Sequence, residues 1–200
     1  MGKTTLAVDI ICARLFKQVR RCFAVCPTFW QQPSLEPLRR VKGAFTKKSV
    51  FTHVSDQIFD ALFKVMDSDH VPTLLFVDDA AAEASTNKGN KGSFARLCIA
   101  APHLNLTIIG CFQRLTSCSP AFRDNCECLI SFIPSKVIDV DTLCKEFNPV
   151  PTHALRDTVV KRALEYAWTH ARFCFIYREA FTGRVYYYCG LNSVINFTAK

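Results

Sequence analysis

The sequence predicts an α/β fold with a mostly parallel sheet flanked by helices. Three short apolar runs, residues 22–27, 73–77 and 106–112, lack polar alternation, which is typical of strands covered on both faces. Segments with helical periodicity separate these runs, and alternation of strands with helices favours parallel pairing. We therefore expect the 200 residues to form a single domain, long enough to bury a continuous core.

The remaining elements are assigned in chain order. Apolar side chains at helical spacing predict a first helix over residues 4–19. A long polar and basic loop is expected at 28–49, before a short strand at 50–54 and a helix capped by Ser55. Beyond these we expect a loop at 85–92, helices at 93–101, 120–125 and 152–170, a strand at 128–133, and a hairpin formed by residues 173–177 and 185–189.

The composition excludes several classes of protein. Half of the residues are apolar and 21% are charged, a balance that excludes a disordered chain. No apolar run reaches the ~18 residues that cross a bilayer, and Lys3, Asp9 and Arg14 interrupt the first segment, so we expect neither a membrane span nor a signal peptide. The eleven cysteines lack metal-binding spacing, and several lie in apolar runs, which favours reduced thiols in an intracellular protein.

Positive charge is concentrated in the first quarter of the chain. Residues 1–50 hold ten Lys or Arg against two acids, and this excess equals the net charge of +8 of the whole chain. Clustered cations suit DNA because they release the counterions of its phosphates, although a merely solvated face is the alternative. The candidate DNA-binding residues are Arg39, Arg40, Lys42, Lys47 and Lys48.

The motif Gly2-Lys3-Thr4-Thr5, at the start of the first predicted helix, matches the end of a P-loop. Amide groups at a helix N-terminus attract phosphate; Lys3 would reach the β- and γ-phosphates of ATP, and Thr4 would hold Mg²⁺. Thr5 would contact the α-phosphate. The glycine that opens such a loop and the strand before it are not in the sequence. We therefore expect the chain to begin within its own P-loop.

Two further motifs follow buried strands. Asp78 and Asp79 end the run that begins at residue 73, as in a Walker B motif. Asp78 would orient Mg²⁺ through its water shell, and Asp79 would act as the general base. Gln113 ends the next run, where its amide would hold the γ-phosphate and the attacking water. The order and distance of these residues after Lys3 suit a P-loop ATPase.

The whole chain resembles the DNA-packaging ATPases of poxviruses and other large eukaryotic DNA viruses, virophages and Polinton-like elements, a branch of the FtsK/HerA superfamily. The resemblance implies a RecA-like core with ATP and Mg²⁺ as cofactors, a homo-oligomeric ring, and movement of double-stranded DNA into a capsid. It also implies capsid proteins as partners and a location at the virus assembly site or in the virion. The matching stretches are residues 2–5, 26–30, 74–79, 103–113 and 122–125, of which the last two are the most specific.

The resemblance also implies an arginine that acts in trans, for which Arg96 and Arg123 are the candidates. The family often has Arg-His before the sensor strand, whereas this chain has Pro102-His103, so the choice stays open. Two other functions also remain open. A P-loop nucleotide kinase would need an arginine-rich lid, but the loop at 85–92 offers only lysines. A catalytically inactive DNA-binding subunit is consistent with an incomplete P-loop.

Overall fold

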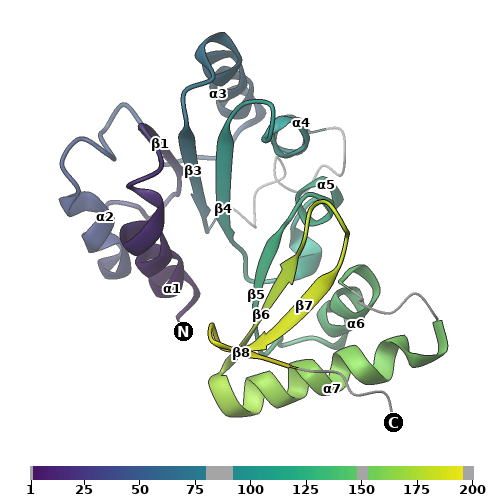
Figure 1. The fold of residues 1–200 in the computed structure, drawn as a ribbon. Helices are drawn as coiled ribbons and strands as arrows, with labels where there is room; N and C mark the ends of the chain where they lie inside the picture. Colours follow the sequence, from purple (N-terminus) through teal and green to yellow (C-terminus); the bar gives the residue numbers. More distant parts are fainter. Residues whose placement is uncertain (1, 80–91, 148–152, 196–200) are drawn as a thin grey trace. The chain divides into compact units, whose positions relative to one another are not determined.

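The computed structural model describes residues 2–79, 92–147 and 153–195, and the chain divides into two compact units. Each unit has its own four-stranded sheet and its own apolar core (Figure 1). The sequence predicted a mostly parallel sheet with a C-terminal helix and hairpin, and the structure places the hairpin in a second sheet. Unit 1 comprises Met1–Gln113 and Ser117–Phe122, and unit 2 comprises Arg114–Thr116 and Arg123–Lys200.

Unit 1 contains the parallel sheet, with strand order β2-β1-β3-β4. All six residues of β3 are buried, as its continuous apolar run predicts for a strand covered on both faces. The predicted strand at 50–54 shortens to two residues, because only Val50 and Phe51 pair with β1. The strands are β1 (Arg21–Val25), β2 (Val50–Phe51), β3 (Thr73–Asp78) and β4 (Leu106–Cys111).

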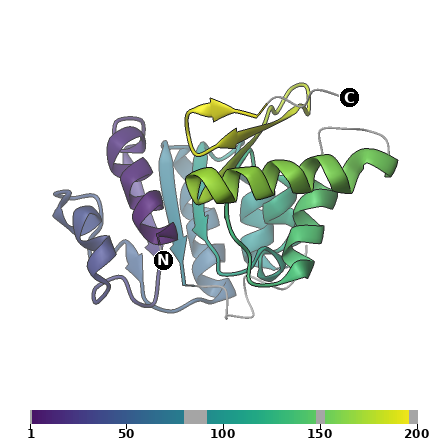
Figure 2. The ribbon, with the colours of Figure 1, turned by 90° about the horizontal axis from the view of Figure 1, so that it is seen from below.

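Helices cover both faces of the parallel sheet (Figure 2). Successive strand residues point to opposite faces, so Leu74 and Phe76 pack with α1 and α2, whereas Leu75 and Val77 pack with α3 and α4. Ser55 caps α3 as predicted, since its hydroxyl accepts the Ile58 amide at 3.4 Å. The helices are α1 (Lys3–Ile10), continued by the π-helical η1 (Ile11–Leu15), α2 (Glu36–Arg40), α3 (Asp56–Asp69) and α4 (Ser93–Ala100).

The prediction of a long loop at residues 28–49 is wrong in part. It contains the 3₁₀ turn η2 (Pro33–Leu35) and α2, and it buries Leu35 and Leu38 in the core. Proline is the first residue of η2 and the second of α2, and in the first turn of a helix its missing N–H leaves no intrahelical bond unmade. The prolines and the high charge therefore suggested a loop, although Glu36 pairs with Arg39 and Arg40 within one short helix.

Unit 2 is built on an antiparallel sheet with strand order β5-β6-β7-β8. The predicted hairpin is confirmed: β6 pairs with β7, and Gly183 has a φ of 67° in the turn. The helix α6 was not predicted, because its Val, Ile and Asp residues are weak helix formers. The elements that follow β4 along the chain are η5 (Leu115–Ser117) and α5 (Pro120–Asp124), which each have residues in both units, and then β5 (Cys128–Phe132), α6 (Val137–Glu146), α7 (His153–Ala171), β6 (Phe173–Arg178), β7 (Val185–Cys189) and β8 (Ser193–Val194).

The core of unit 2 lies between its sheet and the helices α6 and α7, where Leu143, Leu164, Ile176 and Tyr187 are buried together. None of the eleven cysteines, all of which lie in the described residues, is joined in a disulfide. Within the described ranges, no helix combines the length and the hydropathy needed to cross a membrane.

Candidate active site

The candidate site lies at the carboxyl edge of the parallel sheet in unit 1. Val25 is in register with Val77, and Val77 with Gly110, so β1, β3 and β4 end side by side. Asp78 and Asp79 therefore leave the sheet between the segments that follow β1 and β4. Gln113 stands two residues beyond β4 and is exposed. Ligands of open α/β sheets bind at this edge.

The N-terminus of α1 reaches the same edge. The Thr4 hydroxyl lies 3.4 Å from Asp78 Oδ1, which joins the first and second motifs across 74 residues of sequence. Gly2 precedes the helix with a φ of 135°, a conformation that side chains rarely adopt. The first intrahelical bond runs from the Leu6 amide to the Gly2 carbonyl at 2.9 Å, so the amides before Leu6 have no acceptor within the helix. Such amides bind anions.

Asp78 is a buried carboxylate that lacks part of its hydrogen bonding. Its side chain is buried, and Oδ1 accepts the Asp79 amide at 3.1 Å. Oδ2 is buried without a partner among the described residues. Burial raises the pKa of Asp78 to about 6; the hydrogen bond from Thr4 opposes this rise, and the charge of Asp79 adds to it. A cation at this position would satisfy the missing interaction.

This environment fits a Mg²⁺ ion bound together with a phosphate chain. Mg²⁺ usually takes one or two protein ligands, keeps several waters and uses phosphate oxygens for the rest. The Thr4 hydroxyl and the Asp78 carboxylate supply such a partial set. Consistently, the part of the chain that the structure describes holds no cluster of three His, Cys, Asp or Glu side chains able to hold a metal by themselves.

Asp79 has a positive backbone φ. Its φ of 55° is in the left-handed region, which non-glycine residues adopt uncommonly, although Asp does so more readily than most and His70, Asn105 and Arg172 also have a positive φ. The side chain is exposed, and its Oδ2 lies 3.5 Å from the Thr28 hydroxyl. Thr28 also donates to Gln32 Oε1 at 2.9 Å, and the Cys26 sulfur lies 3.7 Å from the Thr28 oxygen. The sequence analysis missed Thr28 and Gln32, although Thr28 falls in the stretch 26–30 that carried the resemblance.

The two arginine candidates have different environments. Arg96, on α4 in unit 1, keeps 63% of its side chain exposed, 3.7 Å from Asp60. Arg123, in unit 2, is only 12% exposed and bonds both carboxylate oxygens of Glu146 at 2.7 and 2.8 Å. An arginine that acts in trans must reach a neighbouring subunit, and this requirement favours Arg96.

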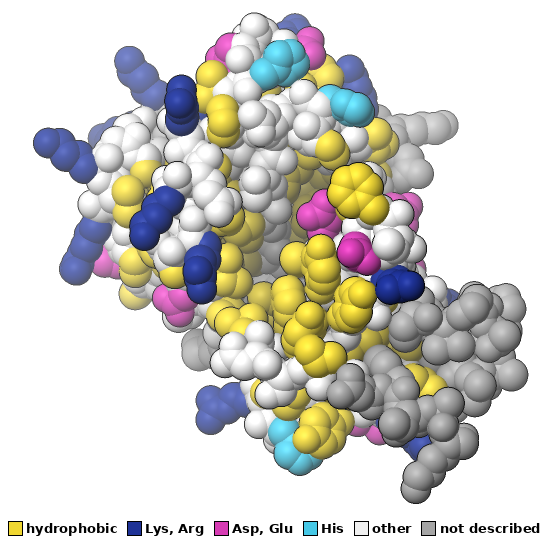
Figure 3. Space-filling model, in the orientation of Figure 1, with side chains coloured by type: hydrophobic (Ala, Val, Ile, Leu, Met, Phe, Trp, Pro, Cys, Tyr) yellow, Lys and Arg dark blue, Asp and Glu magenta, His cyan; other side chains and the backbone are white. Residues whose placement is uncertain are grey.

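The predicted DNA-binding residues also divide into two groups. Arg39 is held within unit 1, because it donates to the carbonyls of Phe29 and Gln32 at 2.7 and 3.0 Å and to Glu36. Hydrogen bonds from Arg39 and Arg40 hold the pKa of Glu36 below its usual range. The other four predicted residues are exposed, and Figure 3 shows basic side chains projecting around the α2 side of unit 1. They are Arg40, Lys42, Lys47 and Lys48.

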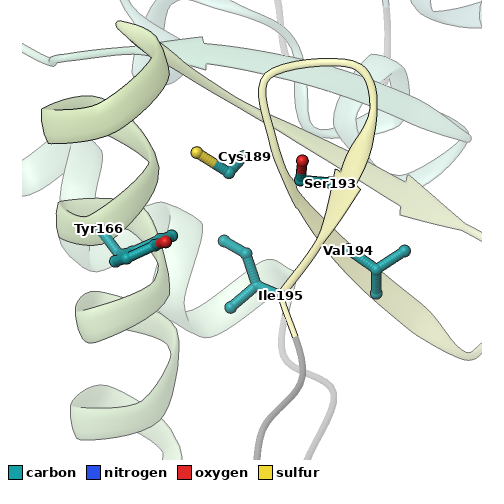
Figure 4. A pocket seen from close by; sticks show the side chains of 5 residues that line it. All are labelled: Tyr166, Cys189, Ser193, Val194 and Ile195. Atoms are coloured by element: carbon teal, nitrogen blue, oxygen red, sulfur yellow. The ribbon is translucent and has the colours of Figure 1, made fainter.

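Two features lie apart from this site. The loop predicted at 85–92 falls, except for its last residue, outside the described residues. Figure 4 shows a pocket of about 330 Å³ in unit 2, between α7 and the turn from β7 to β8. It is lined by Tyr166, Cys189, Ser193, Val194 and Ile195, and contains none of the predicted site residues.

Comparison with known proteins gives a match in structure rather than in sequence. No protein-family model matches the chain, and no curated protein sequence does so. Among solved structures, the genome packaging NTPase B204 of Sulfolobus turreted icosahedral virus 2 in complex with AMP matches with a TM-score of 0.61 and 14% identity, over 92% of this chain and 89% of that one.

Two related structures agree with this match. B204 of Sulfolobus turreted icosahedral virus, a DNA-packaging ATPase, matches with a TM-score of 0.61 and 12% identity, over 92% of this chain and 91% of that one. The virus 2 protein in complex with ATP-gammaS matches with a TM-score of 0.56 and 14% identity, over 93% and 90% of the two chains. The chain therefore has the α/β fold of viral genome-packaging NTPases.

Proposed function

We propose that the chain is an ATPase that hydrolyses ATP with Mg²⁺ and moves double-stranded DNA during the packaging of a viral genome. The observation that carries this proposal is the contact between the Gly2-Lys3-Thr4-Thr5 helix start and Asp78, at the carboxyl edge of a parallel sheet. A phosphate-binding helix start beside a buried, incompletely bonded carboxylate suits Mg-nucleotide chemistry. The fold shared with packaging NTPases supports the same function.

Each residue of the site then has a defined role. The amides at the start of α1 and the Lys3 ammonium bind the phosphates. Thr4 and Asp78 would hold Mg²⁺, which would supply positive charge to neutralise the phosphate oxygens. Asp79 accepts a proton from the attacking water, and the Gln113 amide orients that water and the γ-phosphate.

Movement of DNA requires a surface that holds phosphates without reading bases. Arg40, Lys42, Lys47 and Lys48 supply four exposed positive charges on unit 1. In a homo-oligomeric ring these charges would line the path of the duplex, and Arg96 would reach the nucleotide of the next subunit. Capsid proteins would be the further partners.

The test is ATP hydrolysis measured with and without long duplex DNA, beside duplex binding at several salt concentrations. Replacing Arg40, Lys42, Lys47 and Lys48 by Ala should remove DNA stimulation and reduce the slope of log affinity against log salt, by up to about 0.9 for each lost phosphate contact. The matched control replaces one Arg and three Lys that are exposed in unit 2, Lys136, Lys145, Lys161 and Arg162. Equal slopes in the two variants would contradict the DNA-binding assignment, and absence of Mg-dependent hydrolysis would contradict the function.

A further inference from the structure

The turn between β6 and β7 presents an apolar side chain to solvent. Phe181 lies in the middle of this turn, and its side chain is fully exposed. The turn is held by its own hydrogen bonds: the Gly183 amide donates to the Glu179 carbonyl at 2.8 Å, and the Glu179 amide donates to the Arg184 carbonyl at 2.9 Å. The Thr182 hydroxyl donates to the Glu179 carboxylate and accepts the Arg184 amide at 3.2 Å. A well-bonded turn therefore holds a phenyl ring in water, and a contact that buries this ring would be stabilised by it.

The pocket of unit 2 lies at the other end of the same hairpin (Figure 1, Figure 4). Its volume of about 330 Å³ exceeds the ~150 Å³ of an apolar cavity that holds benzene, so a phenyl ring fits. Among its lining side chains, Tyr166 is 52% exposed and Val194 is 50% exposed, and Leu191 in the adjoining turn is 48% exposed. Apolar groups that gather around a hollow, rather than lying scattered singly, are typical of an interaction site.

Phe181 cannot fill the pocket of its own chain. The strand β7 runs from Val185 to Cys189, about 13 Å at ~3.3 Å per residue, and separates the turn that carries Phe181 from the pocket wall at Cys189. The other pocket residues Ser193 and Val194 form β8, which pairs with the far end of β7. The exposed ring and the pocket therefore belong to opposite ends of one sheet, and they can meet only between two molecules.

Charged groups beside the two features are complementary. Arg184 is exposed in the turn that carries Phe181, and Glu165 is exposed beside Tyr166 at the pocket. His170 stacks on Tyr166 with the ring centroids 4.1 Å apart, and its protonated form has the charge opposite to that of Glu179 in the turn. The pocket end of a second copy therefore complements the turn in charge as well as in shape.

We propose that Phe181 of one chain inserts into the pocket of a second copy, and that this contact joins the subunits head to tail. Each copy has one such turn and one such pocket, so the contact is heterologous and a copy can bind two others. A heterologous contact closes into a ring when the rotation between copies permits it. The inference rests on the proposed function, because it names the contact of the proposed ring, but it requires neither hydrolysis nor DNA.

The first experiment measures the mass of the assembly by sedimentation equilibrium at several protein concentrations. Phe181→Asp places a charge in the turn, and Ser193→Trp fills the pocket with an indole ring. Each should raise the dissociation constant at least about tenfold, as when an interface loses a central aromatic anchor. Ile133→Asp changes another exposed apolar residue of unit 2 and should assemble as the parent protein does. Thermal unfolding of each variant shows that the fold survives, since all three positions are exposed.

Mixing the two impaired variants tests the head-to-tail geometry. Phe181→Asp retains the pocket and Ser193→Trp retains the turn, so one contact can form between them. The mixture should give a 1:1 dimer, tighter than the self-association of either variant, and no larger species. A contact made of two turns or of two pockets would not be restored by mixing, and that result would contradict the proposal.

Cys189 offers a chemical test because it lines the pocket. In Phe181→Cys, oxidation by dipyridyl disulfide should join position 181 of one chain to Cys189 of another, because the two sulfur atoms come within disulfide distance only across the proposed contact. A non-reducing gel should show covalent dimers and larger products, and peptide masses should identify the linked pair. Combining Phe181→Cys with Cys189→Ser should abolish this product. Absence of the linked pair in Phe181→Cys would overturn the proposed contact.

The outcomes distinguish the inference from the proposed function. If the parent protein assembles and Phe181→Asp assembles equally well, the contact is wrong and the ring stands. If Phe181→Asp keeps its assembly but loses binding of duplex DNA, the partner of Phe181 is DNA and the inference is wrong. If the parent protein is monomeric at every concentration, the inference and the ring both fail, whereas Mg-dependent hydrolysis would still support the ATPase.

Discussion

In unit 2 the buried polar side chains have hydrogen-bond partners, whereas unit 1 leaves a buried carboxylate oxygen at its sheet edge without a partner among the described residues. Asp139 in unit 2 accepts both the amide and the hydroxyl of Thr116 at 3.0 Å. The Tyr187 hydroxyl donates to the Phe147 carbonyl, and Trp168 donates to the Ser131 carbonyl at 2.9 Å. These bonds stabilise the fold of unit 2.

Unit 1 shows the opposite pattern at its carboxyl edge. Among the described residues, two buried side-chain atoms lack a hydrogen-bond partner, Asp78 Oδ2 and Ser34 Oγ, and both belong to unit 1. An unpaired carboxylate oxygen costs far more than an unpaired hydroxyl, because it carries charge. The difference indicates that the sheet edge of unit 1 is arranged for a ligand and that the polar groups of unit 2 support structure.

The largest effect should come from the two carboxylates of unit 1. Asp79→Asn should retain Mg-nucleotide binding and lower turnover by about 10²–10⁴, the usual loss when a general base is removed. Asp78→Asn should instead weaken Mg-nucleotide binding, because a neutral amide cannot balance the positive charge of Mg²⁺. Single-turnover hydrolysis and a binding titration measure the two quantities separately. Equal loss of binding in both variants would show that the roles are assigned wrongly.

A smaller effect should distinguish the two arginines. Arg123→Ala leaves Glu146 unpaired and should lower the free energy of unfolding by about 2–3 kcal/mol. This is less than the ~3–5 kcal/mol typical of a fully buried pair, because Glu146 keeps 26% of its side chain exposed. Arg96→Ala should cost less than about 1 kcal/mol, as for an exposed pair, and should instead slow hydrolysis in the proposed ring. Urea unfolding and ATPase assays check both. A stable but inactive Arg123→Ala protein would make Arg123 the residue that acts in trans.

The pH dependence of stability should reveal the burial of Asp78 in metal-free protein. Burial raises its pKa from 3.8 to about 6, so the folded state favours the protonated carboxyl. The stability that this proton provides is complete below pH ~4 and is lost as the pH rises through ~6. We expect the free energy of unfolding, relative to Asp78→Asn measured under the same conditions with a chelator, to fall across this interval. A constant difference between the two proteins from pH 4 to pH 7 would mean that Asp78 is not buried as described.

The sequence predicted the parallel strands and their terminal polar residues well, because β3 and β4 are short apolar runs with few alternative conformations. The sequence assigned both Thr4 and Asp78 to Mg²⁺ without predicting a contact between them, and the structure brings these side chains within 3.4 Å. The roles of Asp79 and Gln113 stay predictions, although both residues leave the same sheet edge.

Other features depend on contacts that the sequence does not contain. Arg39 and Arg40 are adjacent and chemically identical, yet 18% of the Arg39 side chain is exposed against 77% of the Arg40 side chain. Thr28 lies beside Asp79, which is 51 residues away in the sequence. The division into two units was missed because β5 is apolar like the parallel strands, and only its antiparallel pairing with β6 assigns it to a second sheet. Long-range pairing of this kind decides topology, and local periodicity does not report it.

The most direct test of the account is the affinity of the protein for Mg-ATP after Lys3→Ala, compared with Lys17→Ala. Both lysines are exposed, but Lys3 opens α1 beside Asp78, whereas Lys17 lies beyond the end of η1. If the sheet edge of unit 1 is the nucleotide site, Lys3→Ala should weaken binding at least about tenfold, as expected for a lost charge-assisted contact to phosphate, and Lys17→Ala should not change it. Equal affinities in an equilibrium titration of the two variants would contradict the assignment of this edge as the ATP site.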